Sequence, residues 1–159
     1  MITWERMQQT DALPVYAMMR DFYERRLGTV TDAMLWENLS RCTGPDALLE
    51  GWVILSEGAL AGYAILSRGY DPARAAEIRR LEEFYIDRPF RRTRAARDFL
   101  EALPGLYAGC AWVEAVAEKD TAVWRQLGYR AGGTVMRRAC PPREPDPSAK
   151  PRPGRKKAT

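Results

Sequence analysis

Hydrophobic periodicity changes repeatedly along residues 1–139, and this pattern most limits the folds open to the chain. Apolar side chains recur at i, i+3, i+4 and i+7 from Val15 and again from Ala96, a spacing typical of helices packed on one face. Short apolar runs such as Trp52–Leu55 lie between these stretches and indicate buried strands. A chain of 159 residues that mixes the two patterns predicts one α/β domain with a mixed sheet.

The predicted elements follow the order β-α-α-β-β-β-α-β-α-β. Strands are expected at Ile2–Met7, in a hairpin over 51–68, and at 77–86, Cys110–Val116 and Thr134–Ala139. Helices are expected over 11–27 and 32–41, from Arg92 or Thr93 to Pro104-Gly105, and over 119–127. Asp11 and Thr31 are the expected N-caps of the first two helices, because short polar side chains accept bonds from free N–H groups at a helix start.

Positive charge is concentrated at the end of the chain. The net charge of +4 comes from 25 Lys and Arg against 21 Asp and Glu, and residues 140–159 alone hold six basic and two acidic residues. Six of the eleven prolines lie in the same segment. Because it is proline-rich and poor in apolar residues, 140–159 is predicted to be a disordered basic tail that follows a domain at 1–139. The tail lacks interleaved aromatic residues, so a solubilising role is favoured over nucleic-acid binding.

The chain contains no histidine. A histidine general base, a Ser-His-Asp or Cys-His nucleophile and a histidine-ligated metal are therefore excluded. The three cysteines, Cys42, Cys110 and Cys140, lie far apart and form no CxxC pair, so no metal site is predicted. No apolar run approaches the ~20 residues of a membrane span. No apolar stretch follows the N-terminal charges as in a signal peptide, so a cytoplasmic location is expected.

A strand, a short turn and a helix start follow one another over residues 84–97. Five arginines lie within ten residues there: Arg88, Arg91, Arg92, Arg94 and Arg97. The first N–H groups of a helix are unpaired and attract anions, and arginine adds forked donors that match phosphate oxygens. The segment therefore predicts a site for a phosphorylated ligand. The alternative is a solvated basic helix end whose arginines pair with nearby acids at the surface.

Three segments together resemble the GNAT N-acetyltransferases. They are the strand Gly62-Tyr63-Ala64-Ile65-Leu66, the strand–turn–helix Leu81–Leu100 and the helix end Trp124-Arg125-Gln126-Leu127-Gly128-Tyr129. The resemblance covers residues 2–139, and it implies a mixed, largely antiparallel central sheet flanked by helices. It also implies direct transfer of an acetyl group from acetyl-CoA, as cosubstrate, to an amine on a small molecule or peptide, by a monomer or homodimer.

The resemblance assigns acetyl-CoA to the end of the strand at 77–86 and the turn after it. The backbone of Phe84, Tyr85 and Ile86 would bind the pantetheine arm as an added strand. The pyrophosphate would lie on a turn formed by Arg91, Arg92, Thr93, Arg94, Ala95 and Ala96. Members of the family carry glycine where this chain has Arg94. The arginine would either obstruct the site or replace lost backbone contacts by its charge.

Glu83 is the expected general base. An attacking alkylammonium has a pKa of about 10 and needs a base, and in the family a glutamate often precedes the residues that bind pantetheine. Strict alternation along the strand places Glu83 on one face with Leu81 and Tyr85. The alternative is a structural ion pair between Glu83 and an arginine, for which there are three candidates: Arg79, Arg80 and Arg91.

The general-acid position departs from the family pattern. Family members commonly use a tyrosine in the helix at 119–127 to protonate the leaving thiolate, and this chain has Trp124 there. An indole N–H has no usable acidity, so Trp124 would hold the thioester sulfur or pack in the core. Ala117 stands where an asparagine is frequent in the family. These departures favour an alternative function, a GNAT-like domain with weak or lost activity that acts as a binding module.

The resemblance implies that three aromatic residues in the first two helices line the acceptor site: Phe22, Tyr23 and Trp36. They would form an aromatic-walled pocket for the amine. The alternative is that they belong to the hydrophobic core, as most aromatic residues of amphipathic helices do.

Overall fold

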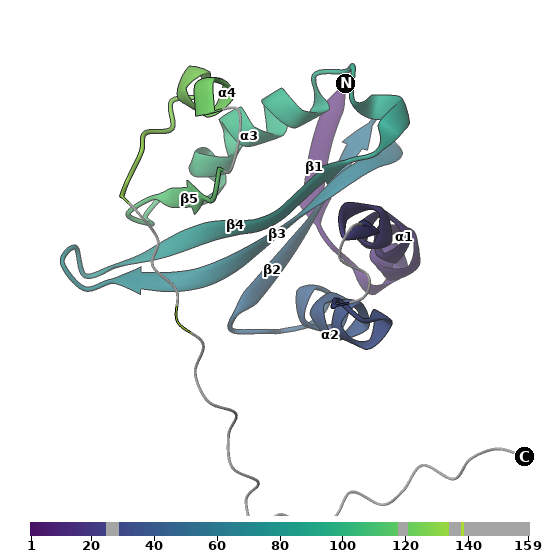
Figure 1. Cartoon of the computed structure of the whole chain (residues 1–159). Helices are drawn as coiled ribbons and strands as arrows, with labels where there is room; N and C mark the ends of the chain where they lie inside the picture. Colours follow the sequence, from purple (N-terminus) through teal and green to yellow (C-terminus); the bar gives the residue numbers. More distant parts are fainter. Residues whose placement is uncertain (25–28, 118–120, 134–137, 139–159) are drawn as a thin grey trace, which may run out of the picture.

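A five-stranded sheet forms the centre of the computed structural model, which describes residues 1–24, 29–117, 121–133 and 138 (Figure 1). The strands are β1 (Ile2–Arg6), β2 (Leu49–Ser56), β3 (Ala59–Asp71), β4 (Ala76–Ile86) and β5 (Val113–Ala115). They lie in the order β1-β2-β3-β4-β5. The first four are antiparallel neighbours, and β5 pairs parallel with β4. The mixed, largely antiparallel sheet is therefore confirmed.

The helices form one layer on each face of the sheet (Figure 1). They are α1 (Ala12–Phe22), α2 (Asp32–Cys42), α3 (Ala95–Leu106) and α4 (Thr121–Gln126). Two short 3₁₀ helices, η1 (Gln9–Asp11) and η3 (Arg88–Phe90), lie before α1 and α3. α1 and α2 cover one face, which we call the α1–α2 face, and α3 and α4 cover the α3–α4 face. β4, α3 and β5 form the βαβ unit that the element order predicts.

Each face of the sheet has its own hydrophobic core. On the α1–α2 face, buried side chains of both helices pack against β2 and β3: Val15, Met19, Leu35, Leu39, Val53, Tyr63 and Ile65. On the α3–α4 face, α3 packs on the same strands through another set: Ile54, Ala64, Leu66, Phe99, Leu100 and Leu103. Burying one such apolar side chain stabilises the fold by about 1.5–3 kcal/mol. The apolar stripes of the sequence are therefore the surfaces that hold the layers together.

The two predicted N-caps have different outcomes. Thr31 caps α2 as expected, because its hydroxyl accepts a hydrogen bond from the N–H of Met34. Asp11 does not cap α1. Its carboxylate accepts the N–H of Gln8 (2.7 Å) instead. The reason is that η1 precedes α1, and Asp11 is the last residue of η1 and bonds to the residue before its first turn.

α3 begins and ends later than the sequence predicts. The expected start at Arg92 or Thr93 is wrong, because η3 and the turn after it occupy these positions, and the helix begins at Ala95. Pro104 is a predicted stop, but α3 continues through it to Leu106. The proline removes the one backbone bond that its N–H would make to the C=O of Leu100, and it stands so near the helix end that few helical residues follow it.

Two other elements are shorter than predicted. α1 ends at Phe22, well before the expected end at 27, and β5 is shorter than the predicted Cys110–Val116. The predicted strand Thr134–Ala139, except residue 138, and the tail 140–159 lie outside the described residues, so both stay predictions. Among the described helices, none is long and apolar enough to cross a membrane.

β4 contains a β-bulge at Glu82. Ile65 of β3 lies opposite Glu83, whereas the next residue, Leu66, lies opposite Leu81, so β4 has one residue more than β3 at this point. An extra residue shifts the alternation of side chains along a strand. Leu81 therefore packs in the core of the α3–α4 face, while Glu83 points to the α1–α2 face. The prediction that these two residues share a face is wrong.

A buried carboxylate, that of Glu50, joins four strands beside the α3–α4 core. Its oxygens accept bonds from Arg6 (3.0 Å), Arg68 (2.6 Å) and the Tyr107 hydroxyl (2.7 Å). The guanidinium of Arg79 lies 3.5 Å away and is itself buried. Burial alone would raise the pKa of Glu50. The bonds from Tyr107 and Arg6 and the nearby positive charges outweigh it, so the pKa lies below its ordinary value.

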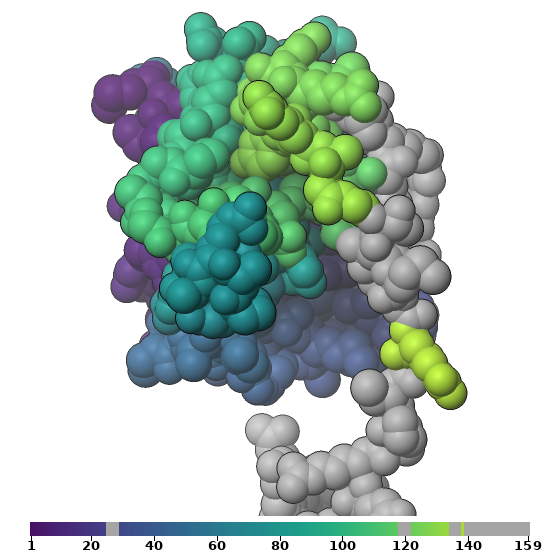
Figure 2. Space-filling view, turned by 90° about the vertical axis from the view of Figure 1, so that its left-hand side faces the viewer, coloured from purple at the N-terminus to yellow at the C-terminus, as the bar shows by residue number. Residues whose placement is uncertain are grey.

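The β3–β4 hairpin extends beyond the other strands. Pairing of β2 with β3 ends at Leu49 and Ser67, whereas β3 and β4 stay paired as far as Asp71 and Ala76. Figure 2 views the molecule from this end and shows the hairpin (teal) in front of the sheet, with α3 and α4 (green) above it. The hairpin thus lies at the end of the sheet where β5 pairs with β4, opposite the end at which α3 begins.

Candidate functional site

β4 and β5 separate part of the way along the sheet (Figure 1). Their pairing runs only from Arg79 with Val113 to Leu81 with Ala115, and β4 then continues to Ile86. On that side, residues 82–86 have no neighbouring strand within the described chain. Unpaired N–H and C=O groups along a strand can bind an extended ligand as an extra strand. The predicted pantetheine-binding residues, Phe84, Tyr85 and Ile86, lie in this opening.

The start of α3 lies beside the end of β4. Ala95 and Ile86 are buried in the same core, which holds the helix terminus next to the opening. The N–H of Ala95 donates to the Thr93 hydroxyl (3.2 Å). Within the part of the chain that the structure describes, the N–H groups of Ala96 and Arg97 have no acceptor, as is usual in a first helical turn. These groups and the helix dipole favour an anion at this point.

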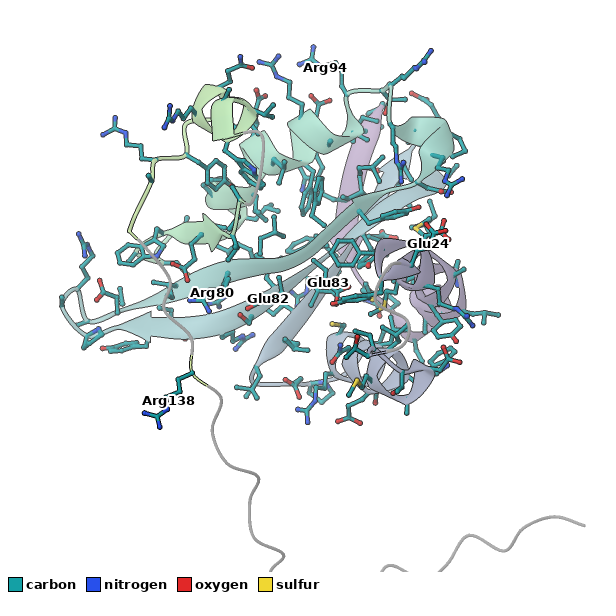
Figure 3. The ribbon with its side chains drawn as sticks, in the orientation of Figure 1. Glu24, Arg80, Glu82, Glu83, Arg94 and Arg138 are labelled. Carbon is teal, nitrogen blue, oxygen red and sulfur yellow. The ribbon has the colours of Figure 1, made fainter. Side chains whose placement is uncertain are left out.

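Two arginines of the turn point in different directions. Arg91 folds back on β4, where its Nε donates to the C=O of Ile86 (3.0 Å) and its guanidinium carbon lies 5.3 Å from the centre of the Tyr85 ring. The Arg94 side chain is 74% exposed and pairs with Asp98 along the outside of α3 (3.1 Å; Figure 3). Its stem therefore leads away from the helix start and leaves the N–H groups uncovered. Surface pairing with acids, the alternative role predicted for these arginines, also occurs at Arg94.

Glu83 is enclosed by tyrosines on the α1–α2 face. The residue is only 5% exposed, and Figure 3 shows it between β4 and the helices of that face. Its Oε1 accepts the hydroxyl of Tyr23 (2.6 Å), and its Oε2 accepts the hydroxyl of Tyr63 (2.9 Å). The predicted alternative, an ion pair with an arginine of β4 or of the turn, is wrong, because no described guanidinium contacts this carboxylate.

The environment of Glu83 makes its carboxylate more basic. Burial raises the pKa of Glu83 above its ordinary value, because the charged form loses its water. The hydrogen bonds from Tyr23 and Tyr63 partly oppose this rise, and the neighbouring charge of Glu82 adds to it. Burial also raises the pKa of the Cys42 thiol, to about 12, so this nearby thiol stays protonated. Among these groups, Glu83 is the one suited to accept a proton near neutral pH.

A second tyrosine–carboxylate pair lies beside Glu83. The hydroxyl of Tyr85 donates to Asp21 near the end of α1 (3.1 Å), and the rings of Tyr85 and Tyr63 lie 6.1 Å apart. Sequence reasoning did not identify Tyr63 or Asp21 as site residues. Tyr63 could have been found, because it stands in the Gly-aromatic strand that the resemblance to the family includes. No sequence pattern pointed to Asp21, since its partner Tyr85 is 64 positions away.

No group of three or more acidic or thiol side chains able to hold a metal ion occurs in the described residues.

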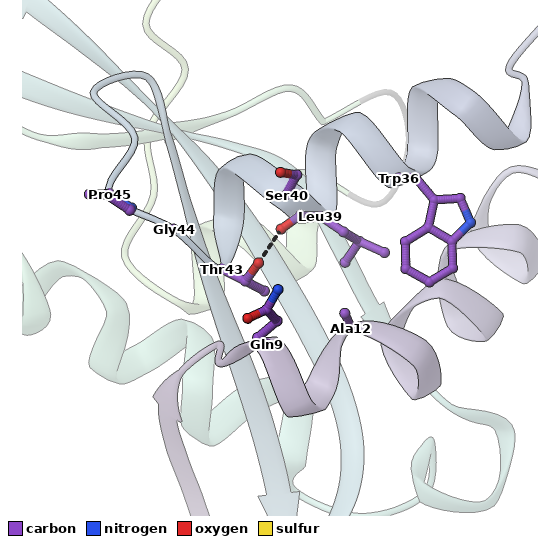
Figure 4. A pocket seen from close by; sticks show the side chains of 8 residues that line it. All are labelled: Gln9, Ala12, Trp36, Leu39, Ser40, Thr43, Gly44 and Pro45. Atoms are coloured by element: carbon purple, nitrogen blue, oxygen red, sulfur yellow. Dashed lines mark hydrogen bonds between the residues drawn. The ribbon is translucent and has the colours of Figure 1, made fainter. Parts of the chain in front are cut away.

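The three predicted acceptor-site residues lie in two places. Tyr23 contacts Glu83, and Phe22 packs edge-on against Tyr23 with ring centres 4.8 Å apart. Trp36 instead stacks on Tyr16 between α1 and α2, with ring centres 4.6 Å apart. It lines a separate pocket of about 550 Å³ (Figure 4), together with Gln9, Ala12, Leu39, Ser40, Thr43, Gly44 and Pro45. The structure therefore does not bring all three residues to one pocket, because α2 presents Trp36 to α1 rather than to β4.

Trp124 and Glu83 lie on opposite faces of the sheet. Trp124 is half-buried against the core of the α3–α4 face and packs edge-on against Tyr129, with ring centres 5.1 Å apart. These contacts fit the predicted alternative, in which Trp124 is part of the core. The Tyr129 hydroxyl is buried and has no hydrogen-bond partner in the described chain, and burial raises its pKa.

Gly62 lets β3 approach β4 closely at the end of β4, where it lies opposite Ile86. A Cβ here would collide with the C=O oxygen of Tyr85 and lie 2.7 Å from Cδ1 of Ile86. Gly62→Ala should therefore lower the free energy of unfolding by about 1–3 kcal/mol, because β4 would have to shift. Gly105→Ala is the control, since no atom lies within 4 Å of that added Cβ and alanine favours a helix. Equal melting temperatures for the two variants would contradict the close approach.

The comparisons of this chain with known proteins give matches in structure but not in sequence. No family model matches it, and no curated protein matches it. Solved structures do match, and the similarity extends over most of the chain at low sequence identity.

A possible acetyltransferase from Clostridium difficile 630 is 10% identical, with a TM-score of 0.73 over 87% of this chain and 96% of that one. A GNAT family acetyltransferase from Staphylococcus aureus USA300_TCH1516 is 15% identical, with a TM-score of 0.66 over 87% and 98%. AAC(6')-Iy, in complex with the bisubstrate analogue CoA-S-monomethyl-acetylneamine, is 18% identical, with a TM-score of 0.67 over 88% and 99%. At such identities the likeness concerns architecture: the chain has the GNAT acetyltransferase fold.

Proposed function

We propose that the chain is an N-acetyltransferase that moves an acetyl group from acetyl-CoA to an amine acceptor by direct transfer. The observation that carries this proposal is the opening between β4 and β5, which ends beside the start of α3 and borders the strand that holds Glu83. Structural neighbours support it, because several are described as acetyltransferases and one holds a CoA bisubstrate analogue. A fold hosts many functions, so the proposal rests mainly on the site.

The described residues fit the parts of acetyl-CoA. The edge of β4 at Phe84, Tyr85 and Ile86, beside which no described strand pairs, would bind the pantetheine arm by backbone hydrogen bonds, with Arg91 already bonded to the C=O of Ile86. The diphosphate would bind at the start of α3, where Ala96 offers a free N–H. The turn before it supplies positive charge from three arginines, Arg91, Arg92 and Arg94. In the same turn, the hydroxyl of Thr93 accepts the N–H of Ala95.

Glu83 would act as the base of the reaction. The acceptor arrives as an ammonium ion and must lose a proton before its nitrogen can attack the thioester carbonyl. The C–N bond then forms and the C–S bond breaks, and CoA leaves as a thiol with the second proton of the nitrogen. Trp124 cannot supply that proton. Most of the rate would come from alignment of the two substrates, together with deprotonation of the amine.

Thermal unfolding with acetyl-CoA tests the binding site. The melting temperature should rise with ligand concentration, by about 5–10 °C at one hundred times the dissociation constant. Arg94→Gly should weaken the affinity about two- to fivefold, because a surface charge is lost while the space stays the same. Arg94→Lys, which keeps the charge, is the control. No shift at millimolar acetyl-CoA would rule out the proposed activity, and tighter binding by Arg94→Gly would show that Arg94 obstructs the site.

A second candidate function is a GNAT-fold binding module with weak or lost activity. The observation that favours it is the position of Trp124, which packs in the core and leaves no acid at the usual place. Release of free thiol from acetyl-CoA, measured across a panel of primary amines, separates the two functions. Acetyl-CoA binding without any amine-dependent thiol release would favour the module.

A further inference from the structure

Both oxygens of the Glu83 carboxylate are covered by phenol hydroxyls. Tyr23 donates to one oxygen at 2.6 Å and Tyr63 to the other at 2.9 Å, and the carboxylate is almost completely buried. An acceptor amine that came from solvent would meet a tyrosine before it met Glu83. A direct hydrogen bond between the amine and the carboxylate would require one phenol to leave.

The two phenols differ in their access to solvent. Tyr63 lies in the middle of β3, is completely buried, and packs in the core beneath α1 and α2. Tyr23 directly follows the last residue of α1 and is half-buried, next to the exposed ring of Phe22. The described surroundings therefore leave the Tyr23 hydroxyl as the group between Glu83 and an approaching amine.

The geometry points to Tyr23 as a catalytic proton relay between the acceptor amine and Glu83, with Tyr63 as the positioning residue that holds the carboxylate. This inference rests on the proposed acetyl transfer. The ammonium N–H bond breaks and its proton goes to the Tyr23 oxygen, while the Tyr23 proton passes to Oε1 of Glu83. Tyr23 ends neutral, Glu83 ends protonated, and the amine is free to attack, so the step needs no other reactant.

The charged and titratable groups around Glu83 are consistent with this direction of transfer. They come from every element packed against it: Tyr23 after α1, Cys42 of α2, Tyr63 of β3, and Glu82 and Tyr85 of β4. Burial and the Glu83 charge raise the pKa of Tyr63, so this phenol keeps its proton and continues to donate to Oε2. The relay therefore has one carboxylate that accepts a proton, one buried donor, Tyr63, and one half-buried donor, Tyr23.

Tyr23→Phe and Tyr63→Phe form a matched pair, because each removes one hydroxyl bond from the same carboxylate. With n-butylamine as acceptor, Tyr23→Phe should lower kcat about 100-fold or more, and Tyr63→Phe less than about tenfold. The pH profile of Tyr23→Phe should follow the free amine and keep rising with pH, since the amine must lose its proton to water. Acetyl-CoA should stabilise both variants as it stabilises the wild type. Equal losses in the two variants, or an unchanged profile in Tyr23→Phe, would overturn the relay.

A second measurement does not depend on activity. Tyrosine labelled with ¹³C at the ring carbon that bears the hydroxyl gives one signal per tyrosine, and the two variants assign those of Tyr23 and Tyr63. n-Butylammonium chloride should move the Tyr23 signal saturably and leave that of Tyr63 in place. Tetramethylammonium chloride, which has no N–H, should move neither. A shift at Tyr63 alone, or none at Tyr23, would overturn the inference even if acetyl transfer is observed. A protein that fails to bind acetyl-CoA but shows the Tyr23 shift would instead overturn only the proposed activity.

Discussion

Glu83→Gln should lower kcat for acetyl transfer about 100-fold or more and leave acetyl-CoA binding close to that of the wild type. Glutamine has the shape of glutamate, and its amide can still bond to Tyr23 and Tyr63, so the packing of the site is kept. It cannot accept the proton of the amine. Thiol release measured at saturating acetyl-CoA reports kcat, and the shift in melting temperature with acetyl-CoA reports binding.

Glu82→Gln provides the matched control. Glu82 precedes Glu83 in the same strand, but it is exposed and accepts the Ser67 hydroxyl (2.5 Å). Its loss should change kcat less than about threefold, since exposed charges have small effects. If the two variants were equally active, Glu83 would not be the base.

Glu83→Gln should also change how the free energy of unfolding depends on pH. Burial raises the pKa of Glu83 in the folded protein above its unfolded value. The folded state therefore binds this proton more tightly, and the contribution to stability is complete below the unfolded pKa and is lost as pH rises through the folded pKa. Glu83→Gln lacks this loss. Its melting temperature should rise relative to that of the wild type as the pH increases above the ordinary pKa of a glutamate, whereas a constant difference would contradict the buried carboxylate.

Glu50→Gln should destabilise the fold by about 3–5 kcal/mol, which corresponds to a fall in melting temperature of about 6–20 °C. The carboxylate of Glu50 bonds to Arg6, Arg68 and Tyr107, and it lies close to the buried guanidinium of Arg79. A neutral amide would leave these positive charges close together without a compensating charge. Chemical and thermal unfolding measure the loss.

Glu77→Gln is the control for Glu50. Glu77 also pairs with Arg79 (2.8 Å), but its side chain is 56% exposed, so its replacement should cost less than about 1 kcal/mol. Because the pKa of Glu50 is lowered in the folded protein, its contribution is present above the unfolded pKa and is lost as pH falls through the folded pKa. The gap between wild type and Glu50→Gln should therefore shrink in acid. A gap that persists at low pH would show that shape, not charge, is responsible.

The layers of the fold could be predicted because they depend on local patterns. The stripe that begins at Val15 forms α1, and the stripe that begins at Ala96 forms α3, each against the sheet. The Thr31 cap of α2 is also a local interaction, between residues three positions apart. The strand–turn–helix at the end of β4 was visible for the same reason, since its turn and its arginines are adjacent in sequence.

The surroundings of Glu83 could not be predicted, because they depend on contacts between distant residues. Tyr23 is 60 positions from Glu83 and Tyr63 is 20 positions away, and neither spacing follows from periodicity. Trp36 packs against Tyr16 of α1 and not against the sheet. The apolar stripe of a helix shows which side is buried, but it does not show whether that side meets another helix or a strand. The side of the sheet to which Glu83 points depends on the bulge, and the sequence of β4 contains no glycine or proline to mark it.

The bulge at Glu82 decides which face of the sheet carries the carboxylate of Glu83. It divides the strand into two segments whose side chains alternate in opposite phase, with Leu81 in one core and Glu83 near the other. With the bulge straightened and all residues kept, regular alternation would put Glu83 on the face of Leu81 and turn the carboxylate into the apolar core under α3. Loss of Glu82 would instead make Leu81 and Glu83 neighbours and keep them on opposite faces. The exposed extra residue, rather than any side-chain contact of its own, thus allows one strand to place a leucine among leucines and an acid among tyrosines.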